Sequence, residues 1–193
     1  MSGADPRVRA VLKLAPVIPV FTPDDVDDAV QVAQALFRGG LPVVEVTLRT
    51  PRAMEAIKAM AEAVPDAVIG AGTVLTAAQM QAVKEAGGRF AVSPGATDRL
   101  YAAARDTDLP FLPGVANAGD IMRGMDLGLD RFKFFPAATS GGIPALKALA
   151  GGLALRPCAA RIARRRSRWS LVLRRCSSLK SSLEPSFNIL NNF

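Results

Sequence analysis

Residues 42–75 read PVVEVTLRTPRAMEAIKAMAEAVPDAVIGAGTVL, and this stretch contains the unit on which most of the chain is built. A β-rich run at Pro42–Leu48 is followed by an amphipathic helical stretch at about 51–63 and by a second β-rich run at Ala67–Ala71. Two strands joined through a helix in this way are typical of a parallel βαβ unit. The stretch therefore predicts a parallel α/β fold.

The same alternation of strands and helices extends from this stretch in both directions. The further candidate strands are Pro16–Phe21, Arg89–Val92, Leu109–Leu112 and Arg131–Phe135. The further candidate helices lie at about residues 24–38, 76–86, 97–105, 119–127 and 143–150. Successive strands begin 20 to 26 residues apart, as consecutive βα units do.

Capping residues mark the ends of these helices. Gly39–Gly40, Gly87–Gly88 and Gly128 stand at predicted helix C-termini, where glycine is preferred. Thr22-Pro23-Asp24-Asp25 predicts a helix start, with Thr22 as the N-cap and Pro23 at the first helical position. The two aspartates lie where the helix dipole favours negative charge.

Six βα units with no reversal signal fit either an open doubly wound sheet or most of an eight-unit barrel. Gly70-Ala71-Gly72 lacks the third glycine of a dinucleotide-binding turn, which disfavours an open dinucleotide fold. A barrel of this period needs two more strands. Only the apolar runs Leu153–Leu155 and Trp169–Leu173 fall near the required places, and the pattern stops being legible near residue 151.

The net charge of +7 comes from one end of the chain. Residues 1–150 hold 15 basic and 16 acidic residues, whereas residues 151–193 hold 9 basic and 1 acidic. The chain has no His, and its two Cys, Cys158 and Cys176, both lie in the basic end. Histidine bases, Ser-His-Asp triads and histidine metal ligands are therefore excluded. Proton transfer in the body is left to Glu, Asp, Lys, Tyr or water.

A lysine interrupts the aromatic strand at Arg131–Phe135. Alternation sets Lys133 on the face opposite Phe132 and Phe134, so Lys133 points into a barrel if the two phenylalanines pack on helices. A low-dielectric interior disfavours an ammonium and favours a neutral amine that can form a Schiff base. The alternative is a lysine that reaches solvent from the strand end or pairs with a carboxylate.

A polar stripe runs along the strand at Pro42–Leu48. Glu45, Thr47 and Arg49 share one face by alternation, while the apolar residues between them face the helices. Such a face is usually solvated, but in a parallel barrel it is interior, where charges need partners. Glu45 beside Lys133 would supply an acid–base group next to an amine. Arg49 suits a carboxylate ligand.

Three strands end in turns that contain glycine or proline: Gly70-Ala71-Gly72-Thr73, Ser93-Pro94-Gly95 and Leu112-Pro113-Gly114. Glycine at these points would let a ligand approach the backbone. An ordinary β-to-α turn, with Thr73 as a helix cap in the first case, is sufficient to explain each of them.

Together these motifs resemble the 2-dehydro-3-deoxy-phosphogluconate (KDPG) aldolase / 4-hydroxy-2-oxoglutarate aldolase family across about residues 10–150. The matching stretches are Glu45-Val46-Thr47-Leu48-Arg49-Thr50, Gly70-Ala71-Gly72-Thr73-Val74-Leu75, Ser93-Pro94-Gly95, Gly124-Met125-Asp126-x-Gly128 and Arg131-Phe132-Lys133-Phe134-Phe135-Pro136-Ala137. The resemblance implies a (β/α)8 TIM barrel, usually a homotrimer, that needs no metal and no organic cofactor. Residues 1–150 would form about six of its βα units, and a basic Arg/Ser-rich tail at 151–193 would replace the last two.

The resemblance also implies a role for each candidate site residue. Lys133 is the expected Schiff-base nucleophile and Glu45 the expected general acid/base. The expected substrate-binding residues are Arg49 and Thr73 for the pyruvate-derived carboxylate, and Pro94 and Phe135 for the pocket wall. The implied reaction is a lyase step of the Entner–Doudoroff pathway, in which 2-dehydro-3-deoxy-6-phosphogluconate, a phosphorylated keto acid, gives pyruvate and glyceraldehyde 3-phosphate.

The sequence departs from the family after about residue 150. Where the family holds the substrate phosphate with a Thr-Gly-Gly turn and a Gly-Ser turn, this chain has Arg156–Arg161 and no glycine after Gly152. We expect free edges on the first and sixth strands, an open barrel, hydration of Lys133, and low stability and aldolase activity. The abrupt change indicates an altered reading frame or C-terminus, which translating the coding DNA in the other frames beyond codon 150 would test.

Two nearby activities and two other classes of protein remain as alternatives. The activities are those of a 4-hydroxy-2-oxoglutarate aldolase and a 2-dehydro-3-deoxy-6-phosphogalactonate aldolase, because the missing phosphate turns would discriminate among them. Clustered arginines at Arg161–Arg168 with Trp169 fit a non-catalytic protein that binds nucleic acid. Because no recognition motif accompanies these arginines, nucleic acid is not expected as a partner. A non-catalytic interaction protein that keeps the trimer surface is the other class.

No membrane partner is expected. Arg7, Arg9 and Lys13 precede an apolar stretch that superficially resembles a signal peptide, but Pro16 and Pro19 interrupt it. No apolar run approaches membrane-spanning length. The sequence therefore predicts a cytoplasmic protein.

Overall fold

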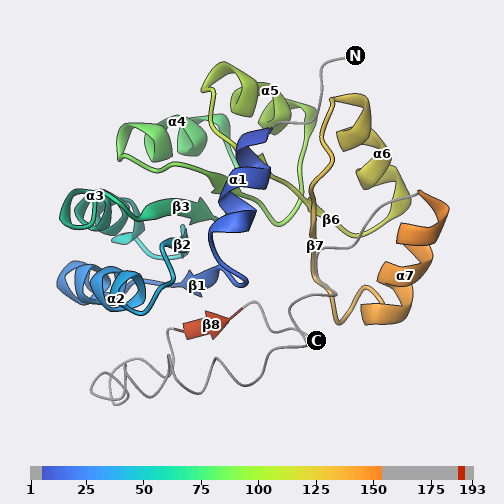
Figure 1. Ribbon diagram of the computed structural model, residues 1–193. Helices are drawn as coiled ribbons and strands as arrows, with labels where there is room; N and C mark the ends of the chain where they lie inside the picture. Colours follow the sequence, from blue (N-terminus) through green and yellow to red (C-terminus); the bar gives the residue numbers. More distant parts are fainter. Residues whose placement is uncertain (1–5, 154–186, 190–193) are drawn as a thin grey trace.

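Strands and helices alternate along the chain in the computed structural model, which describes residues 6–153 and 187–189 (Figure 1). The helices are α1 (Pro6–Leu14), α2 (Val26–Arg38), α3 (Ala53–Ala63), α4 (Ala77–Glu85), α5 (Asp98–Asp106), α6 (Ala118–Asp126) and α7 (Gly142–Gly152). The strands are β1 (Pro19–Phe21), β2 (Val43–Thr47), β3 (Val68–Gly72), β4 (Ala91–Val92), β5 (Phe111–Leu112), β6 (Gly114–Val115), β7 (Lys133–Phe134) and β8 (Phe187–Ile189). Every predicted strand and helix up to residue 150 has a counterpart, while α1, β6 and β8 were not predicted.

The described strands form two sheets that follow one another around the molecule. The six-stranded sheet has the order β5-β4-β3-β2-β1-β8, and β6 and β7 form a separate two-stranded sheet. β1 to β5 are parallel to one another, and β6 is parallel to β7. Only Pro113 separates Leu112 at the end of β5 from Gly114 at the start of β6. No backbone pairing between described strands closes the ring.

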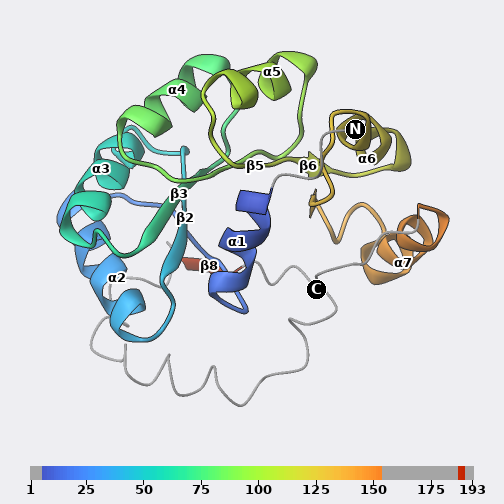
Figure 2. The same ribbon diagram turned by 45° about the horizontal axis from the view of Figure 1, so that its top comes forward.

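Helices cover the outer side of the curved strands. Figure 2 shows α2 to α6 following one another around the outside, with α1 inside this arc. The core between strands and helices contains Val44, Val46, Ile57 and Met60, each at most 1% exposed. All five residues of β2 are buried, so this strand is covered on its inner face as well as its outer face. Burial on both faces is the behaviour of a strand in a parallel α/β sheet.

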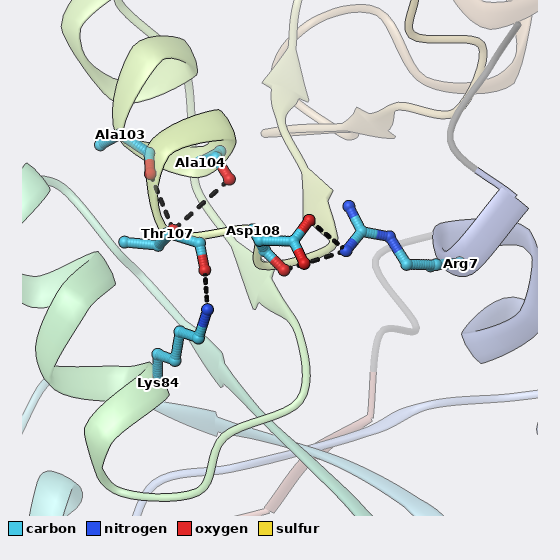
Figure 3. Close-up of polar contacts among 6 residues, drawn as sticks. All are labelled: Arg7, Lys84, Ala103, Ala104, Thr107 and Asp108. Atoms are coloured by element: carbon cyan, nitrogen blue, oxygen red, sulfur yellow. Dashed lines mark hydrogen bonds and ion pairs between the residues drawn. The ribbon is translucent and has the colours of Figure 1, made fainter.

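α1 connects the two sheets at the end where their strands begin. Arg7 donates a hydrogen bond of 2.6 Å to the Asp108 carboxylate, and Asp108 precedes β5 (Figure 3). Arg9 forms an ion pair with Asp130, which precedes β7. Figure 3 also shows Thr107, whose hydroxyl group donates to a carbonyl oxygen at the end of α5. The N-terminal basic residues that resembled a leader segment therefore belong to a helix, and two of them form ion pairs with residues that precede β5 and β7.

The predicted helix ends are confirmed and one predicted helix start is wrong. Backbone φ is positive at the predicted C-terminal glycines Gly40 (84°), Gly87 (84°) and Gly128 (85°). The N-cap of α2 is Asp25 rather than Thr22, because the Asp25 carboxylate accepts hydrogen bonds from the backbone N–H groups of Asp27 and Asp28. The Thr22 hydroxyl group instead lies 2.8 Å from the hydroxyl oxygen of Thr47.

The expectation of a free edge on the first strand is also wrong. β8 pairs antiparallel with β1, with Ile189 opposite Pro19 and Phe187 opposite Phe21. An edge strand presents unpaired N–H and C=O groups, and extended chain of either direction can satisfy them. On the other side of the opening, β6 is the one described strand that pairs with β7.

Several predictions fall on residues outside the described range. Leu153 is the C-cap residue of α7 rather than the first residue of a strand. The remainder of Leu153–Leu155, the Trp169–Leu173 run and the arginines at Arg161–Arg168 lie outside the described residues. Across residues 6–153 and 187–189, no helix has both the length and the apolar character needed to cross a membrane.

Removing β8 should lower the thermal unfolding temperature by several degrees. Deletion of residues 187–193 takes away the hydrogen-bonding partner of the β1 backbone, whereas deletion of residues 190–193 alone leaves β8 in place. Calorimetry of the two truncated chains measures the contribution of β8. Equal unfolding temperatures for the two truncations would contradict the pairing.

Candidate active site

Lys133 enters the barrel from β7. In the two-stranded sheet, Lys133 lies opposite Gly114 of β6. A Cβ atom on Gly124 of α6 would lie only 2.3 Å from the ring of Phe132, so Phe132 packs closely on that helix. The outward position of Phe132 therefore puts Lys133 on the inner face, as the alternation predicts.

Glu45 of β2 meets Lys133 inside the barrel. Lys133 Nζ donates a hydrogen bond of 3.2 Å to Glu45 Oε1, although the two residues are 88 positions apart in the sequence. The Glu45 side chain is 3% exposed and that of Lys133 14% exposed. Lys133 Nζ also lies 5.4 Å from the centre of the Phe135 ring, within the range of a cation–π interaction. An amine, a carboxyl group and an aromatic wall are thus in direct contact.

Burial changes the acidity of Glu45. Removal of the carboxylate from water raises the pKa of Glu45 above its ordinary value, and this effect outweighs the others. The positive charge and hydrogen bond of Lys133 act in the opposite direction, as does the more distant charge of Arg49. A carboxyl group with a raised pKa can donate a proton at a pH where an exposed glutamate cannot.

The two glycines of β3 make room for side chains rather than leaving open backbone. A Cβ atom on Gly70 would lie 2.3 Å from the ring of Phe90, and one on Gly72 would lie 2.1 Å from Glu45 Oε1. Both spaces are therefore filled from inside the protein. The sequence had suggested that these glycines let a ligand approach the backbone. In the structure, the side chains of Phe90 and Glu45 fill the space instead.

The remaining predicted site residues all follow the carboxyl ends of strands. Arg49 is exposed and follows β2, Thr73 comes directly after β3, Pro94 follows β4, and Phe135 comes directly after β7. This is the end of a parallel barrel where ligands and catalytic groups gather. The structure brings Lys133, Glu45 and Phe135 into contact, and it places Arg49, Thr73 and Pro94 after the carboxyl ends of β2, β3 and β4.

Thr73 has an unusual backbone conformation. Its φ angle is +60°, a value that β-branched residues rarely adopt because of steric conflict. The helix that follows begins at Thr76, whose side chain accepts from Gln79 N in a capping box. Thr73 is therefore not the helix cap that an ordinary turn would make it. Strained residues of this kind are concentrated at functional sites.

Pro94 lies against the strand next to Lys133. A Cβ atom on Gly114 would be 2.2 Å from the carbonyl oxygen of Pro94, and Gly114 is the register partner of Lys133. The neighbouring Ser93 is fully buried, and its hydroxyl group has no hydrogen-bond partner among the described residues. This close packing could not be predicted from the sequence, since a glycine after a proline is typical of any turn.

No group of three or more metal-ligating side chains occurs within the described part of the chain. A largely enclosed lysine in hydrogen-bond contact with a buried carboxyl group, on two strands of a parallel α/β fold, is an arrangement by which class I aldolases form and hydrolyse Schiff bases. The geometry thus defines a class of enzyme, and similarity to known proteins defines the family within it.

A family model described as KDPG and KHG aldolase matches residues 8–157. The 2-dehydro-3-deoxy-phosphogluconate aldolase of Zymomonas mobilis is 57% identical over 143 residues, which are 74% of this chain and 68% of that protein. The KHG/KDPG aldolase of Escherichia coli K12 is 49% identical over 143 residues, 74% of this chain and 67% of that protein.

The solved structures agree with the sequence matches. A KDPG aldolase of Legionella pneumophila, crystallised with pyruvate captured as a covalent carbinolamine intermediate, superimposes with a TM-score of 0.74 and 48% identity. That similarity covers 76% of this chain and 71% of the other. The chain therefore belongs to the KDPG and KHG aldolase family, whose members are class I aldolases and hence lyases. Its fold is of the TIM-barrel class.

The raised pKa of Glu45 should appear in the pH dependence of stability. The folded protein keeps a proton on Glu45 above pH 4.5, where the unfolded chain has lost it, so the folded state binds more protons. Stability therefore falls as pH rises from 4.5 through the folded-state pKa, with a slope of at most about 1.4 kcal/mol per pH unit.

Glu45→Gln should remove this contribution. Urea denaturation at several pH values measures the free energy of unfolding for the unmodified chain and for E45Q. Glu62→Gln, at an exposed position of α3, is the matched control and should keep the slope. Parallel stability curves for E45Q and the unmodified chain would contradict the assignment.

Proposed function

We propose that this chain is a class I aldolase that cleaves 2-dehydro-3-deoxy-6-phosphogluconate into pyruvate and glyceraldehyde 3-phosphate, with activity reduced by its altered C-terminus. The observation that carries the proposal is the hydrogen bond between Lys133 and Glu45 inside the barrel. Relatives named for this aldolase, at up to 57% identity, support the substrate. Lys133 is the proposed nucleophile and Glu45 the proposed general acid/base.

Proton transfer between the two side chains activates the amine. Across the 3.2 Å hydrogen bond, the proton of the Lys133 ammonium can pass to Glu45 and leave a neutral amine beside a neutral carboxylic acid. Burial raises the pKa of Glu45, which makes its carboxylate a better acceptor for this proton. The amine then has a free electron pair, and Glu45 carries the proton that the next step requires.

The bond changes follow from these two groups. The Lys133 nitrogen attacks the C2 ketone of the substrate and gives a carbinolamine, from which Glu45 protonates the hydroxyl group so that water leaves and an iminium forms. Glu45 then accepts the proton of the C4 hydroxyl group, the C3–C4 bond breaks, and its electron pair moves into the iminium to give an enamine. Glyceraldehyde 3-phosphate departs, C3 of the enamine is protonated, and water releases pyruvate from Lys133.

Arg49 and Thr73 are proposed to hold the carboxylate of the keto acid. Arg49 is exposed and forms no ion pair among the described residues, so its guanidinium fork is available. The left-handed conformation of Thr73 directs the chain at the end of β3 away from an ordinary strand-to-helix turn. Phe135, next to Lys133 Nζ, and Pro94, next to β6, are proposed as walls of the pocket.

Reduced activity is proposed to arise mainly at the phosphate group. The chain has no glycine after Gly152, so the glycine turns that the family resemblance implies for the phosphate are absent from the sequence. The Lys133 side chain is only 14% exposed, so it is less hydrated than is expected for a lysine in an open barrel. Schiff-base formation should therefore survive better than binding of the phosphorylated substrate.

The family resemblance supports three further parts of the proposal. Residues 1–150 act as the catalytic body and residues 151–193 as a basic tail. Copies of the chain associate as homotrimers. The protein works in the cytoplasm on its phosphorylated keto-acid substrate.

Reduction with borohydride in the presence of pyruvate should trap a covalent adduct on Lys133. Lys133→Gln removes the amine and should abolish the adduct, whereas Lys147→Gln, at an exposed position of α7, should not. Mass spectrometry of the intact chain and of its peptides measures and locates the adduct. An adduct of equal yield in K133Q would contradict the proposed nucleophile.

The same chain should cleave 2-dehydro-3-deoxy-6-phosphogluconate with a kcat/KM at least about 10²-fold below that of a complete relative, since several hydrogen bonds to a charged group are lost. The pyruvate adduct should form with a smaller deficit. Cleavage as efficient as that of the complete relative would contradict the impairment.

Arg49→Gln should raise the pyruvate concentration for half-maximal trapping about 10- to 100-fold, because a hydrogen-bonded ion pair with the carboxylate is lost. The control is Arg52→Gln, which removes an exposed arginine only three positions away that pairs with Glu55 instead. Trapping rates at several pyruvate concentrations give the comparison. Equal effects of the two substitutions would argue against a binding role for Arg49.

A further inference from the structure

The Glu45 carboxyl group occupies a space that exists because residue 72 has no side chain. A Cβ atom on Gly72 would lie 2.1 Å from Glu45 Oε1 and 2.8 Å from both Cδ and Cγ of the same side chain. These separations are shorter than any real contact of a Cβ atom. The conflict involves three atoms along Glu45 rather than its flexible tip alone, so a small rotation of the carboxyl group cannot relieve it.

The backbone gives no other reason for glycine at this position. Gly72 is the last residue of β3 and lies opposite Thr47 of β2 in the parallel register. It is not among the described glycines with positive φ. Any residue can therefore adopt this backbone conformation, and what Gly72 supplies is space.

That space determines where the carboxyl group points. Glu45 comes from β2 and Lys133 from β7, which belong to different sheets among the described strands. The Glu45 side chain must therefore reach across the barrel interior, and it does so over the bare face of Gly72 to end 3.2 Å from Lys133 Nζ. A methyl group on residue 72 would block this path.

We propose that Gly72 is a positioning residue for the reaction: its bare face seats the Glu45 carboxyl group within hydrogen-bond reach of Lys133. The part of this inference that concerns the reaction rests on the proposed function. The steric part stands on the packing alone. The two parts therefore need separate measurements.

The steric part predicts that Gly72→Ala is destabilising only while the Glu45 side chain is present. Overpacking of this kind should raise the unfolding equilibrium constant about tenfold or more. In a Glu45→Ala background the conflicting atoms are absent. Adding G72A there should change the unfolding equilibrium constant by less than about twofold. If G72A fails to fold, the double variant should still fold as well as E45A. Additive effects, or a double variant that fails where E45A folds, would overturn the proposal.

The reaction part predicts a loss of pyruvate trapping and a changed pH dependence. G72A should slow trapping on Lys133 about 10²-fold, as expected when a general acid/base is misplaced. Its pH profile of trapping should match that of E45Q. A structural role alone would lower the yield of folded protein without changing the profile of the folded fraction.

Gly70→Ala is the matched control, since Gly70 lies on the same face of the same strand. A Cβ atom there would meet the Phe90 ring at 2.3 Å, so G70A should destabilise the chain without moving Glu45. Gly95→Ala, where nothing lies within 4 Å of the added atom, should be neutral. Trapping per folded molecule that is slowed as much by G70A as by G72A, or a wild-type pH profile in G72A, would overturn the proposal.

The measurements distinguish failure of the aldolase proposal from failure of the steric role of Gly72. If the unmodified chain forms no pyruvate adduct at all, the aldolase proposal and the reaction role of Gly72 fall together. The stability measurements on G72A, E45A and the double variant would still decide whether Gly72 seats Glu45.

Discussion

Burial of the Glu45 carboxyl group is the constraint on which the arrangement of this protein depends. A carboxylate that is 3% exposed needs a partner, and the only charged side chain that contacts it in the described structure is Lys133. Because Lys133 is on β7, the chain must curve far enough to bring β7 opposite β2. The strands provide this curvature although their described backbone pairing leaves two separate sheets. Pro94 packs closely on Gly114, the first residue of β6. Gly114 is the register partner of Lys133, so this packing helps to position Lys133.

The two ends of the barrel divide stability from chemistry. At the end where strands begin, α1 fastens one loop of each sheet through Arg7 and Arg9, and ion pairs as exposed as these contribute little individually. Their value lies in joining two sheets that lack a shared backbone ladder. At the other end, Thr73 keeps a strained conformation and Arg49 stays unpaired among the described residues. The strained and unpaired residues thus lie at the opposite end of the strands from the ion pairs of α1.

Local patterns made much of this predictable, and long-range contacts explain what was missed. Alternation is a property of a single strand, so the inward positions of Lys133 and Glu45 could be inferred from their own neighbours. Asp25 rather than Thr22 caps α2, and the Thr22 hydroxyl group instead lies within hydrogen-bonding distance of Thr47 on the neighbouring strand. The residues next to Thr22 in the sequence do not reveal this contact. Likewise, Gly72 could be recognised as a glycine in a turn, but the atoms that need its space belong to Glu45.

The direction of β8 explains how it can pair with the edge of β1 without completing the substrate-binding site. Phe187 lies opposite Phe21 at the carboxyl end of β1, and Ile189 lies opposite Pro19 at its amino end. β8 therefore runs toward the end of the barrel where α1 is tied, away from Lys133 and Glu45. An antiparallel strand satisfies the N–H and C=O groups of β1 as a parallel one would. Only a parallel strand, however, delivers the loop that follows it to the catalytic end, where the family resemblance places the phosphate-binding turns. Backbone pairing and substrate binding thus place different demands on the last strand, and β8 meets the first of them.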